Sequence, residues 1–305
     1  MAGQDVVGFD NFSTGHQRNL DFVQAAVGAR FDAFTLVRGD IRDSAACLDA
    51  VRGVEFVLHH AAVASVPLSI EQPALVHDIN VAGTVSVLEA ARKSGVRRVV
   101  YASSSAVYGD RQALPQEEAH IGRPLSPYGT TKRINEIDGD SYSNVFGLET
   151  IGLRYFNVFG PRQDPNGAYA AVIPRWIESV VRHEPLTVYG DLGISRDFCF
   201  IADIARANVM AALRQGLQGG EIVNIASGRE TTLGQLFEAI RDSAWEQGIA
   251  YDFEPIVAPA RAGDIARSVA GVEKAHALLG FSAENGLAAG LARTIDYYRQ
   301  GTARS

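Results

Sequence analysis

Tyr128 and Lys132 are the side chains of this sequence whose types and spacing could move a proton. On a helix, a spacing of four residues places the phenol and the ammonium on one face, about one turn apart. Three consecutive serines, Ser103 to Ser105, follow an apolar segment earlier in the chain. The pattern predicts a proton-handling triad, although the Tyr–Lys spacing alone is also typical of an ordinary pair on a helix surface.

Two helices and a strand are expected to position these groups. Residues 97–102 form an apolar run without alternation, which is typical of a central parallel strand covered on both faces. Pro124 to Pro127 precede the helix that carries Tyr128 and Lys132. A long helix is predicted over 73–94, with Pro73 at its start and Gly95 after its end. Asn80 is polar in this apolar helix, so it either hydrogen-bonds backbone in the core or positions Tyr128.

Further strands are predicted at 33–37, 54–59 and 148–153, with helical segments between them. This alternation predicts an α/β fold with a doubly wound, Rossmann-type, mostly parallel sheet. After residue 160 the segments become shorter and richer in Pro and Gly. We therefore expect a first domain at 1–160 and a smaller α/β substrate domain at 161–305, some of whose segments return to the first. The junction is a natural cleft.

The composition favours a cytoplasmic enzyme. The chain has 305 residues, is 47% hydrophobic and carries a formal charge of −7, which argues against nonspecific nucleic-acid binding. No apolar run is long enough to cross a bilayer, and the N-terminus does not resemble a signal peptide. Cys47 and Cys199 are far apart, so neither a disulfide nor a zinc site is expected. His59 and His60 point to opposite faces of a strand, so no metal site is predicted.

Asp10 follows a short apolar strand, and an acidic residue at this place can bind the adenosine ribose of a dinucleotide. Its carboxylate would repel the additional phosphate of NADP, which favours NAD. A turn-forming Asp–Asn pair is the alternative interpretation. After the strand that ends at His59, the small residues Ala61 and Ala62 would let the backbone approach a flat or charged ligand.

Four motifs together resemble the extended short-chain dehydrogenase/reductase family. They span Tyr101–Gly109, Ser126–Lys132, Leu153–Pro161 and Ser195–Ile201. Within the family they are most similar to UDP-hexose 4-epimerases, particularly those that act on UDP-N-acetylglucosamine (UDP-GlcNAc). The resemblance implies a tightly held NAD that takes a hydride from C4 of the sugar and returns it to the opposite face of a 4-keto intermediate. Tyr128 would remove the C4 hydroxyl proton, helped by Lys132, because a phenol with a pKa of about 10 is a poor base at neutral pH.

The resemblance also assigns the other site residues. Ser104 or Ser105 would donate to the sugar oxygen, and we favour Ser104. The cofactor-binding residues would be Asp10 and Asn11 at the adenosine ribose, Asp40 and Ile41 at the adenine, His60, Ala61 and Ala62 at the pyrophosphate and nicotinamide ribose, and Asn80, Tyr128, Lys132 and Tyr155. Among the substrate-binding residues, Asn157 would contact the diphosphate or the sugar, Thr187 to Tyr189 would line the uracil slot, Arg196 and Arg261 would pair with the phosphates, and Asp264 would accept from the uridine ribose. Ser104, at the sugar oxygen, and Ser268 complete this set.

Two positions distinguish activities within the family. Ala106 stands where decarboxylases carry a glutamate, and dehydratases carry an acidic pair beside their triad, so epimerisation is favoured. Ser268 stands where hexose-restricted enzymes carry a bulky tyrosine. We therefore expect activity on UDP-GlcNAc and UDP-N-acetylgalactosamine (UDP-GalNAc), with UDP-glucose and UDP-galactose as further substrates. A UDP-glucuronate epimerase, a nucleotide-sugar dehydratase and a non-catalytic or truncated family member that binds a nucleotide sugar are the alternatives.

The family's opening strand and its GxxGxxG turn are not found in this sequence. Residues 1–7 resemble instead the end of the family's first helix and its second strand. That turn normally places helix amides against the pyrophosphate, and its loss would leave costly unpaired strand edges. We therefore expect that the start of the sequence is assigned too late or that the chain is truncated, and a cofactor-poor relative is the third alternative. The resemblance further implies a homodimer formed through the 73–94 helix and the helix that carries Tyr128.

Overall fold

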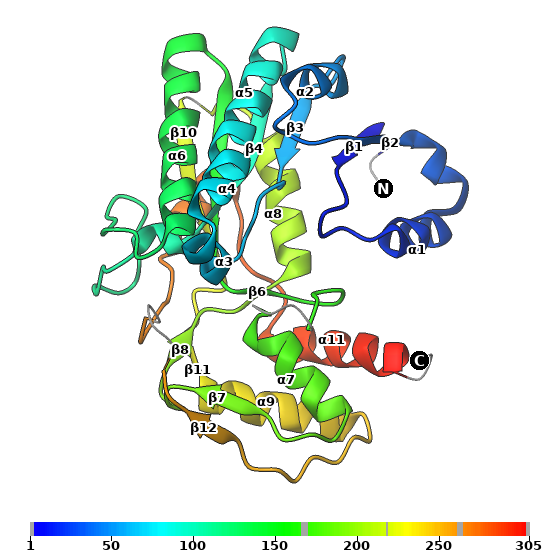
Figure 1. The fold of residues 1–305 in the computed structure, drawn as a ribbon, viewed down its shortest axis with the longest axis vertical. Coiled ribbons are helices and arrows are strands. Elements are labelled where there is room, and N and C mark those ends of the chain that lie inside the picture. Colours follow the sequence, from blue (N-terminus) through cyan, green and yellow to red (C-terminus); the bar gives the residue numbers. More distant parts are fainter. Residues whose placement is uncertain (1–2, 166–169, 218, 261–264, 303–305) are drawn as a thin grey trace.

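The structure is a computed structural model that describes residues 3–165, 170–217, 219–260 and 265–302 (Figure 1). Its centre is a four-stranded parallel sheet in the order β10-β5-β4-β3. The strands are β3 (Phe56–His59), β4 (Arg98–Ser104), β5 (Glu149–Tyr155) and β10 (Gly220–Ile225). Val100 is paired with Leu58 on one side and Ile151 on the other, and is fully buried. The α/β fold with a Rossmann-type parallel sheet is confirmed.

One face of this sheet is covered by the predicted long helix and by α6 (Pro127–Phe146). The long helix comprises α4 (Pro73–His77), a π-helical turn (Asp78–Ala82) and α5 (Gly83–Ser94), and it ends at Gly95 with φ 69°. α6 begins at Ser126, whose side chain accepts from the Gly129 N–H. The long helix starts at Pro73 and ends before Gly95 as predicted, and α6 begins within the predicted 124–127 segment.

The approach of α6 to the sheet depends on two glycines. The Tyr101 ring, which is 2% exposed, lies against both Gly139 of α6 and Gly152 of β5. A Cβ atom at either glycine would come within 2.7 Å of the Tyr101 side chain. The absence of these two side chains lets an aromatic ring fill the space between helix and sheet.

The opposite face is covered by α8 (Ile201–Leu213) and α10 (Glu273–Leu279), which come from the second half of the chain. The fully buried Arg98 guanidinium donates to the carbonyls of Ala211 and Ala212 at the end of α8. β10 also comes from the second half and pairs with β5. The later part of the chain therefore returns to the central sheet.

A smaller part lies below this sheet in Figure 1. Its helices are α7 (Val172–Val181), α9 (Leu233–Glu246) and α11 (Leu287–Thr302), which pack around a hydrophobic core that includes Trp176, Phe237 and Ile295. Its short strands pair as β7 (Thr187–Tyr189) with β12 (Ile256–Ala258), β8 (Ser195–Arg196) with β11 (Thr231–Thr232), and β6 (Val158–Phe159) with β9 (Cys199–Phe200).

The N-terminal unit, residues 6–38, stands beside the central sheet (Figure 1). It contains β1 (Val6–Asp10), α1 (Gln17–Val27), a 3-10 turn (Gly28–Ala33) and β2 (Phe34–Arg38). β1 and β2 form a separate two-stranded parallel sheet, and the side chains of Val6 and Val7 are exposed. The segment between this unit and β4 holds α2 (Ser44–Ala50), β3 and α3 (Val66–Glu71). None of the helices in the described ranges has the length and hydrophobicity of a membrane span.

Candidate active site

Tyr128 lies in the first turn of α6 and faces the end of β4, where Ser104 is the last residue. Tyr128 is 9% exposed. Burial raises the pKa of the Tyr128 phenol, and a hydrogen bond with the Ser104 hydroxyl acts in the opposite direction. Ser104 also accepts from the Ala106 N–H at 3.1 Å, which fixes its rotamer. Two hydroxyl groups from a helix and a strand therefore meet at one point.

Lys132 lies one turn further along α6 and is 4% exposed. Its ammonium donates to the Ala102 carbonyl at 2.8 Å and lies 6.0 Å from the centre of the Tyr128 ring. Burial lowers the pKa of Lys132 to about 8. Ala102 is the one acceptor it has among the described residues, and an ammonium carries three donors, so further donors remain for ligand hydroxyls. A cation at this distance favours the phenolate form of Tyr128.

The geometry favours Ser104 over Ser105 as the third member of this group. Ser105 begins a 3-10 turn, Ser105–Tyr108, that leads the chain away from the strand. Ser103 faces the other side of β4 and donates to the Glu136 carboxylate at 2.6 Å. The three serines therefore differ in role because alternate residues of a strand point to opposite faces.

A buried ion pair holds α6 against the sheet next to Tyr128 and Lys132. Glu136, one turn after Lys132, accepts two hydrogen bonds from the Arg154 guanidinium of β5, at 2.7 and 2.9 Å. Burial opposes ionisation of Glu136, but the hydrogen bonds and charge of Arg154 outweigh it and lower the pKa of Glu136. Together with Ser103, this pair joins α6, β4 and β5. The sequence analysis missed it, although Tyr128, Lys132 and Glu136 share one helical face.

Asn80 lies in the π-helical turn and is fully buried. Its side-chain oxygen accepts from the Val63 N–H at 2.8 Å, and its nitrogen donates to the Val63 carbonyl and to the Thr131 hydroxyl of α6. The sequence offered two roles for Asn80, a hydrogen bond to backbone in the core or the positioning of Tyr128. Its contacts include both, because it binds the Val63 backbone and also holds the helix that carries Tyr128. It exposes no surface to a ligand, so its side chain is placed for positioning rather than for the predicted cofactor contact.

The residues assigned to the adenosine lie together after β1 and β2. Asn11 donates to the Asp40 carboxylate at 3.0 Å, and Asp10 accepts from the Phe12 N–H. Hydrogen bonds from Arg42 hold the pKa of Asp40 well below its ordinary value. Ile41 is 7% exposed and its side chain lies beside Gly83. The structure thus brings these predicted residues to one edge, with Ile41 mostly in the core.

His60, Ala61 and Ala62 follow β3, and the His60 ring lies 3.0 Å from the Tyr155 hydroxyl at the end of β5. Asn208 of α8 completes this contact by donating to the same hydroxyl at 2.8 Å. His59 points the other way and bonds Thr84, and burial lowers the pKa of His59 to about 3. Asn208 has no signal in the sequence, because only the crossing of α8 over the sheet places it here.

These groups fit a dinucleotide. Predicted cofactor residues follow the carboxyl ends of β1, β2, β3 and β5, which is where ligands bind in open parallel sheets. The unused donors of Lys132 and the exposed Asp10 carboxylate suit ribose hydroxyls.

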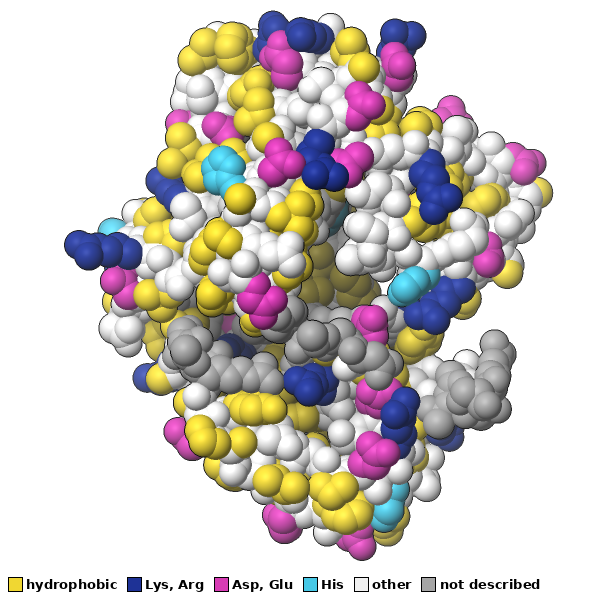
Figure 2. Space-filling model, viewed as in Figure 1, with side chains coloured by type: hydrophobic (Ala, Val, Ile, Leu, Met, Phe, Trp, Pro, Cys, Tyr) yellow, Lys and Arg dark blue, Asp and Glu magenta, His cyan; other side chains and the backbone are white. Residues whose placement is uncertain are grey.

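The predicted substrate residues surround a cavity of about 340 Å³ in the smaller part. Its lining includes Asn157, Thr187, Tyr189 and Arg196. Asn157 lies two residues after Tyr155, which is paired with Ser104, so this cavity adjoins the strand ends beside Tyr128. Figure 2 shows the surface hollowed between the larger and smaller parts of the molecule.

Among the described residues, the predicted substrate residues Ser104 and Ser268 do not line this cavity. Ser268 is 1% exposed, and its hydroxyl donates to the side chain of Gln116 at 3.3 Å. Arg261 and Asp264 lie outside the described residues. The sequence analysis also missed Asp197, which is fully buried and accepts from the backbone N–H groups of Ser227, Gly228 and Ala270. Asp197 therefore holds together the loops behind the cavity lined by Asn157 and Arg196.

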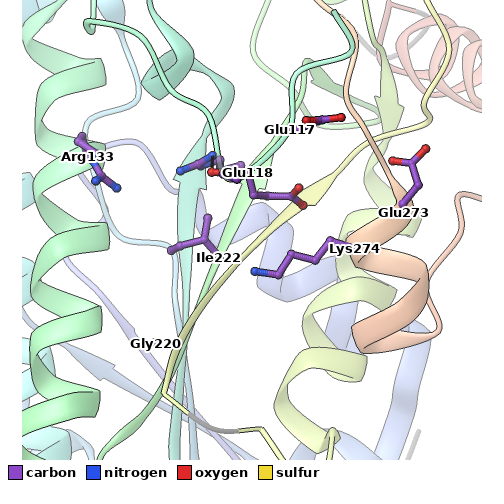
Figure 3. Close-up of a pocket in the computed structure, with 9 residues that line it drawn as sticks. Glu117, Glu118, Arg133, Gly220, Ile222, Glu273 and Lys274 are labelled. Atoms are coloured by element: carbon purple, nitrogen blue, oxygen red, sulfur yellow. Dashed lines mark hydrogen bonds between the residues drawn. The ribbon is translucent and has the colours of Figure 1, made fainter.

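A larger cavity, of about 530 Å³, lies elsewhere and contains no predicted site residue (Figure 3). Its charged side chains are largely engaged with the protein. Arg133 pairs with Glu136 at 3.0 Å, Lys274 pairs with Glu221 at 2.9 Å, and Glu118 accepts from the Asn224 N–H. Size alone does not make it the active site, because it has neither the phenol nor the paired donors found beside β4.

Comparison with known proteins gives a consistent result. Residues 1–226 match the model of the NAD dependent epimerase/dehydratase family. A putative UDP-glucose 4-epimerase of Methanocaldococcus jannaschii is 37% identical over 299 residues, which cover 97% of this chain and 90% of that protein. The match does not confirm the prediction that the family's first strand and Gly-rich turn are missing.

Two solved structures are similar over nearly the whole chain. UDP-glucose 4-epimerase of Thermotoga maritima, bound to UDP-glucose, has a TM-score of 0.89 at 32% identity and covers 98% of this chain and 92% of its own. UDP-N-acetylglucosamine 4-epimerase of Methanobrevibacter ruminantium M1, in complex with UDP-N-acetylmuramic acid, has a TM-score of 0.88 at 32% identity and covers 97% and 91%.

Proposed function

Because the chain belongs to the NAD-dependent epimerase/dehydratase family, we propose that it interconverts a UDP-hexose and its 4-epimer through a 4-keto sugar, with UDP-GlcNAc and UDP-GalNAc as the preferred pair. The observation that carries the proposal is the convergence of Tyr128, Ser104 and Lys132 at the end of β4. The cofactor is NAD, and the residues that would hold it are those that follow the strand ends, among them Asp10, His60 and Tyr155.

The protein's own residues handle the proton. The hydroxyl at sugar C4 would lie between Ser104 and Tyr128, where the serine donates to its oxygen and the Tyr128 phenolate removes its proton. Lys132, which donates to the Ala102 carbonyl, would lower the cost of the phenolate and would bind a ribose hydroxyl of NAD with its remaining donors. The chemistry that NAD supplies when bound is reversible oxidation at C4. Rotation of the ketone in the cavity then exposes its other face, and return of the proton from Tyr128 completes inversion.

The surroundings of the triad favour epimerisation over dehydration. Elimination of water needs an acid–base group beside the triad, and residues 103–108 provide only Ser, Ala, Val and Tyr side chains. The carboxylate nearest along α6, Glu136, is held by Arg154 and Ser103 and is 2% exposed. A 4-keto sugar formed here therefore returns to an alcohol.

The direct test is interconversion of UDP-GlcNAc and UDP-GalNAc by the purified chain supplied with NAD. Tyr128→Phe should reduce turnover by about 10³-fold, because the general base is lost. Tyr142→Phe, near the end of the same helix, should leave it unchanged. A protein that binds UDP-sugars but turns over none of them would instead be a binding member of the family.

The preference for acetylated sugars rests on the small Ser268 and is supported by the similarity to the M. ruminantium enzyme. Ser268→Tyr should suppress turnover of the acetylated pair and spare UDP-glucose and UDP-galactose. Because Ser268 is buried against Gln116, a thermal melt and UDP binding must accompany the assay. Equal losses on both pairs in a folded variant would refute this assignment.

We also propose that two copies associate through the long helix and α6. Apolar side chains such as Leu75, Ile137 and Phe146 are exposed on these helices. Light scattering that shows a monomer at assay concentration would contradict this.

A further inference from the structure

Arg175 is a cation in the substrate cavity to which the sequence analysis gave no role. It lies on α7 and, with Val172, Trp176 and Ser179, forms one wall of the 340 Å³ cavity. It is partly buried, and its guanidinium makes no hydrogen bond or ion pair with any residue that the structure describes. By contrast, Arg182, at the end of the same helix, pairs with Glu178 at 2.7 Å. A guanidinium without an acceptor beside a cavity suggests that a ligand supplies one.

The wall that carries Arg175 lies at the end of the cavity assigned to the base. Trp176 donates from its indole nitrogen to the Thr187 carbonyl at 3.0 Å, so α7 is held directly against β7. Pro185 and Thr187 line the cavity beside it. Asn157 and Arg196, which were assigned to the phosphates and sugar, also line the cavity but come from other segments. These two segments are joined by the hydrogen bond that the Asn157 side chain donates to the Asp197 carbonyl. Flat apolar walls of Trp and Pro suit a planar base better than a phosphate.

We propose that Arg175 determines the base specificity of the nucleotide site by donating to a carbonyl oxygen of a uracil-type pyrimidine. The inference rests on the proposed function, since it assumes that a nucleotide occupies this cavity. A guanidinium can only donate hydrogen bonds, so it matches the carbonyl at C4 of uracil or thymine. Cytosine presents an amino group at that position, and two donors facing each other leave both unsatisfied. The ligand class is therefore a pyrimidine nucleoside diphosphate with a carbonyl at C4.

The test compares the affinities of UDP, CDP and uridine for the NAD-loaded protein by calorimetry. Arg175→Leu should weaken UDP binding about 10-fold and leave CDP nearly unchanged, so that the preference for UDP over CDP falls. Arg175→Lys, which keeps a donor, should retain part of the preference. Arg182→Leu, on the same helix but outside the cavity, is the matched control and should change neither affinity.

The possible outcomes separate the inference from the proposed function. Equal weakening of UDP and CDP with no change for uridine would show a phosphate contact and overturn the base assignment. No change in any affinity would also overturn it, while normal UDP binding and epimerisation by the unaltered protein would leave the proposed function intact. Failure of the unaltered protein to bind UDP at all would reject both.

Discussion

The central sheet and the N-terminal unit differ in how deeply they bury the residues that were assigned to the site. Five of the seven residues of β4 are buried and none is exposed, and α6 buries Tyr128, Lys132 and Glu136 along one face. In β1 none of the five residues is buried, and α1 also has no buried residue. The groups proposed to move a proton therefore lie in a packed core, whereas Asp10 and Asn11, assigned to the adenosine ribose, lie at the end of an exposed two-stranded sheet.

The difference separates two physical requirements. Proton transfer needs a fixed geometry and a low dielectric, and both come from burial and from a second layer of contacts such as Arg154–Glu136. Binding the far end of a long cofactor tolerates adjustment, because its hydrogen bonds contribute affinity rather than chemistry. We therefore expect changes behind the triad to be costly for stability and changes in the N-terminal unit to be mild and local.

The largest effect is expected for Glu136→Gln. This change leaves the Arg154 guanidinium, which is 1% exposed, as an uncompensated buried charge, so the free energy of unfolding should fall by about 3–5 kcal/mol. Urea denaturation at pH 7 measures it. Glu89→Gln, which breaks the exposed pair with Arg92, is the control and should cost at most about 1 kcal/mol. Similar losses in both variants would mean that burial does not distinguish these pairs.

Lys132→Met tests whether the buried ammonium itself opposes folding. Burial lowers the pKa of Lys132 from 10.5 to about 8, so between these values the unfolded chain binds the proton and the native protein does not. The stability of the unaltered, cofactor-free protein should therefore rise with pH in this window by up to about 3 kcal/mol relative to the variant. Denaturation of both proteins at pH 7.5, 9 and 10.5 measures the difference between their free energies of unfolding. The titrations of all other groups are common to both proteins and cancel in this difference.

The same variant should lose epimerase turnover by about 10²-fold, since the phenolate loses its cation. A stability difference that does not change with pH would contradict the buried-ammonium account, whereas unchanged turnover would contradict the role of Lys132 in the proposed reaction.

Local signals in the sequence predicted much of the packed region. The apolar run gave a central strand at 97–102, observed as Arg98–Ser104, and Pro73 and Gly95 marked the limits of the long helix. The i,i+4 spacing placed Tyr128 and Lys132 on one buried face. These features depend on short-range periodicity and capping, which a single sequence contains.

Contacts between residues that are far apart in the chain could not be predicted from the sequence. The Glu136–Arg154 pair depends on the register of β5 beside β4, and Asn208 depends on how α8 crosses the sheet. α1 was not predicted, since its residues bury no face that would give a periodic signal. Arg175 could not be distinguished from surface arginines until α7 was placed against β7.

The smallest effect is expected where the N-terminal unit contacts the smaller part. Arg162 donates to the Asn19 side chain of α1 at 2.8 Å and lies 4.0 Å over the Phe22 ring and 5.4 Å from the ring of Tyr297 in α11. Arg162→Ala should remove this link at a cost of about 1 kcal/mol, because one hydrogen bond and two partly exposed cation–π contacts are lost.

Hydrogen exchange, read peptide by peptide, is the suitable measurement because it reports local opening. Amides of residues 17–27 should exchange about 5-fold faster in Arg162→Ala, whereas those of 98–104 and 127–146 should not change. Arg52→Ala, which breaks an exposed pair with Asp49, is the control and should leave residues 17–27 as they are. If exchange in α6 and β4 accelerated together with α1, the two regions would open as one unit. A local response means that the adenosine end can adjust without disturbing the geometry of Tyr128 and Ser104.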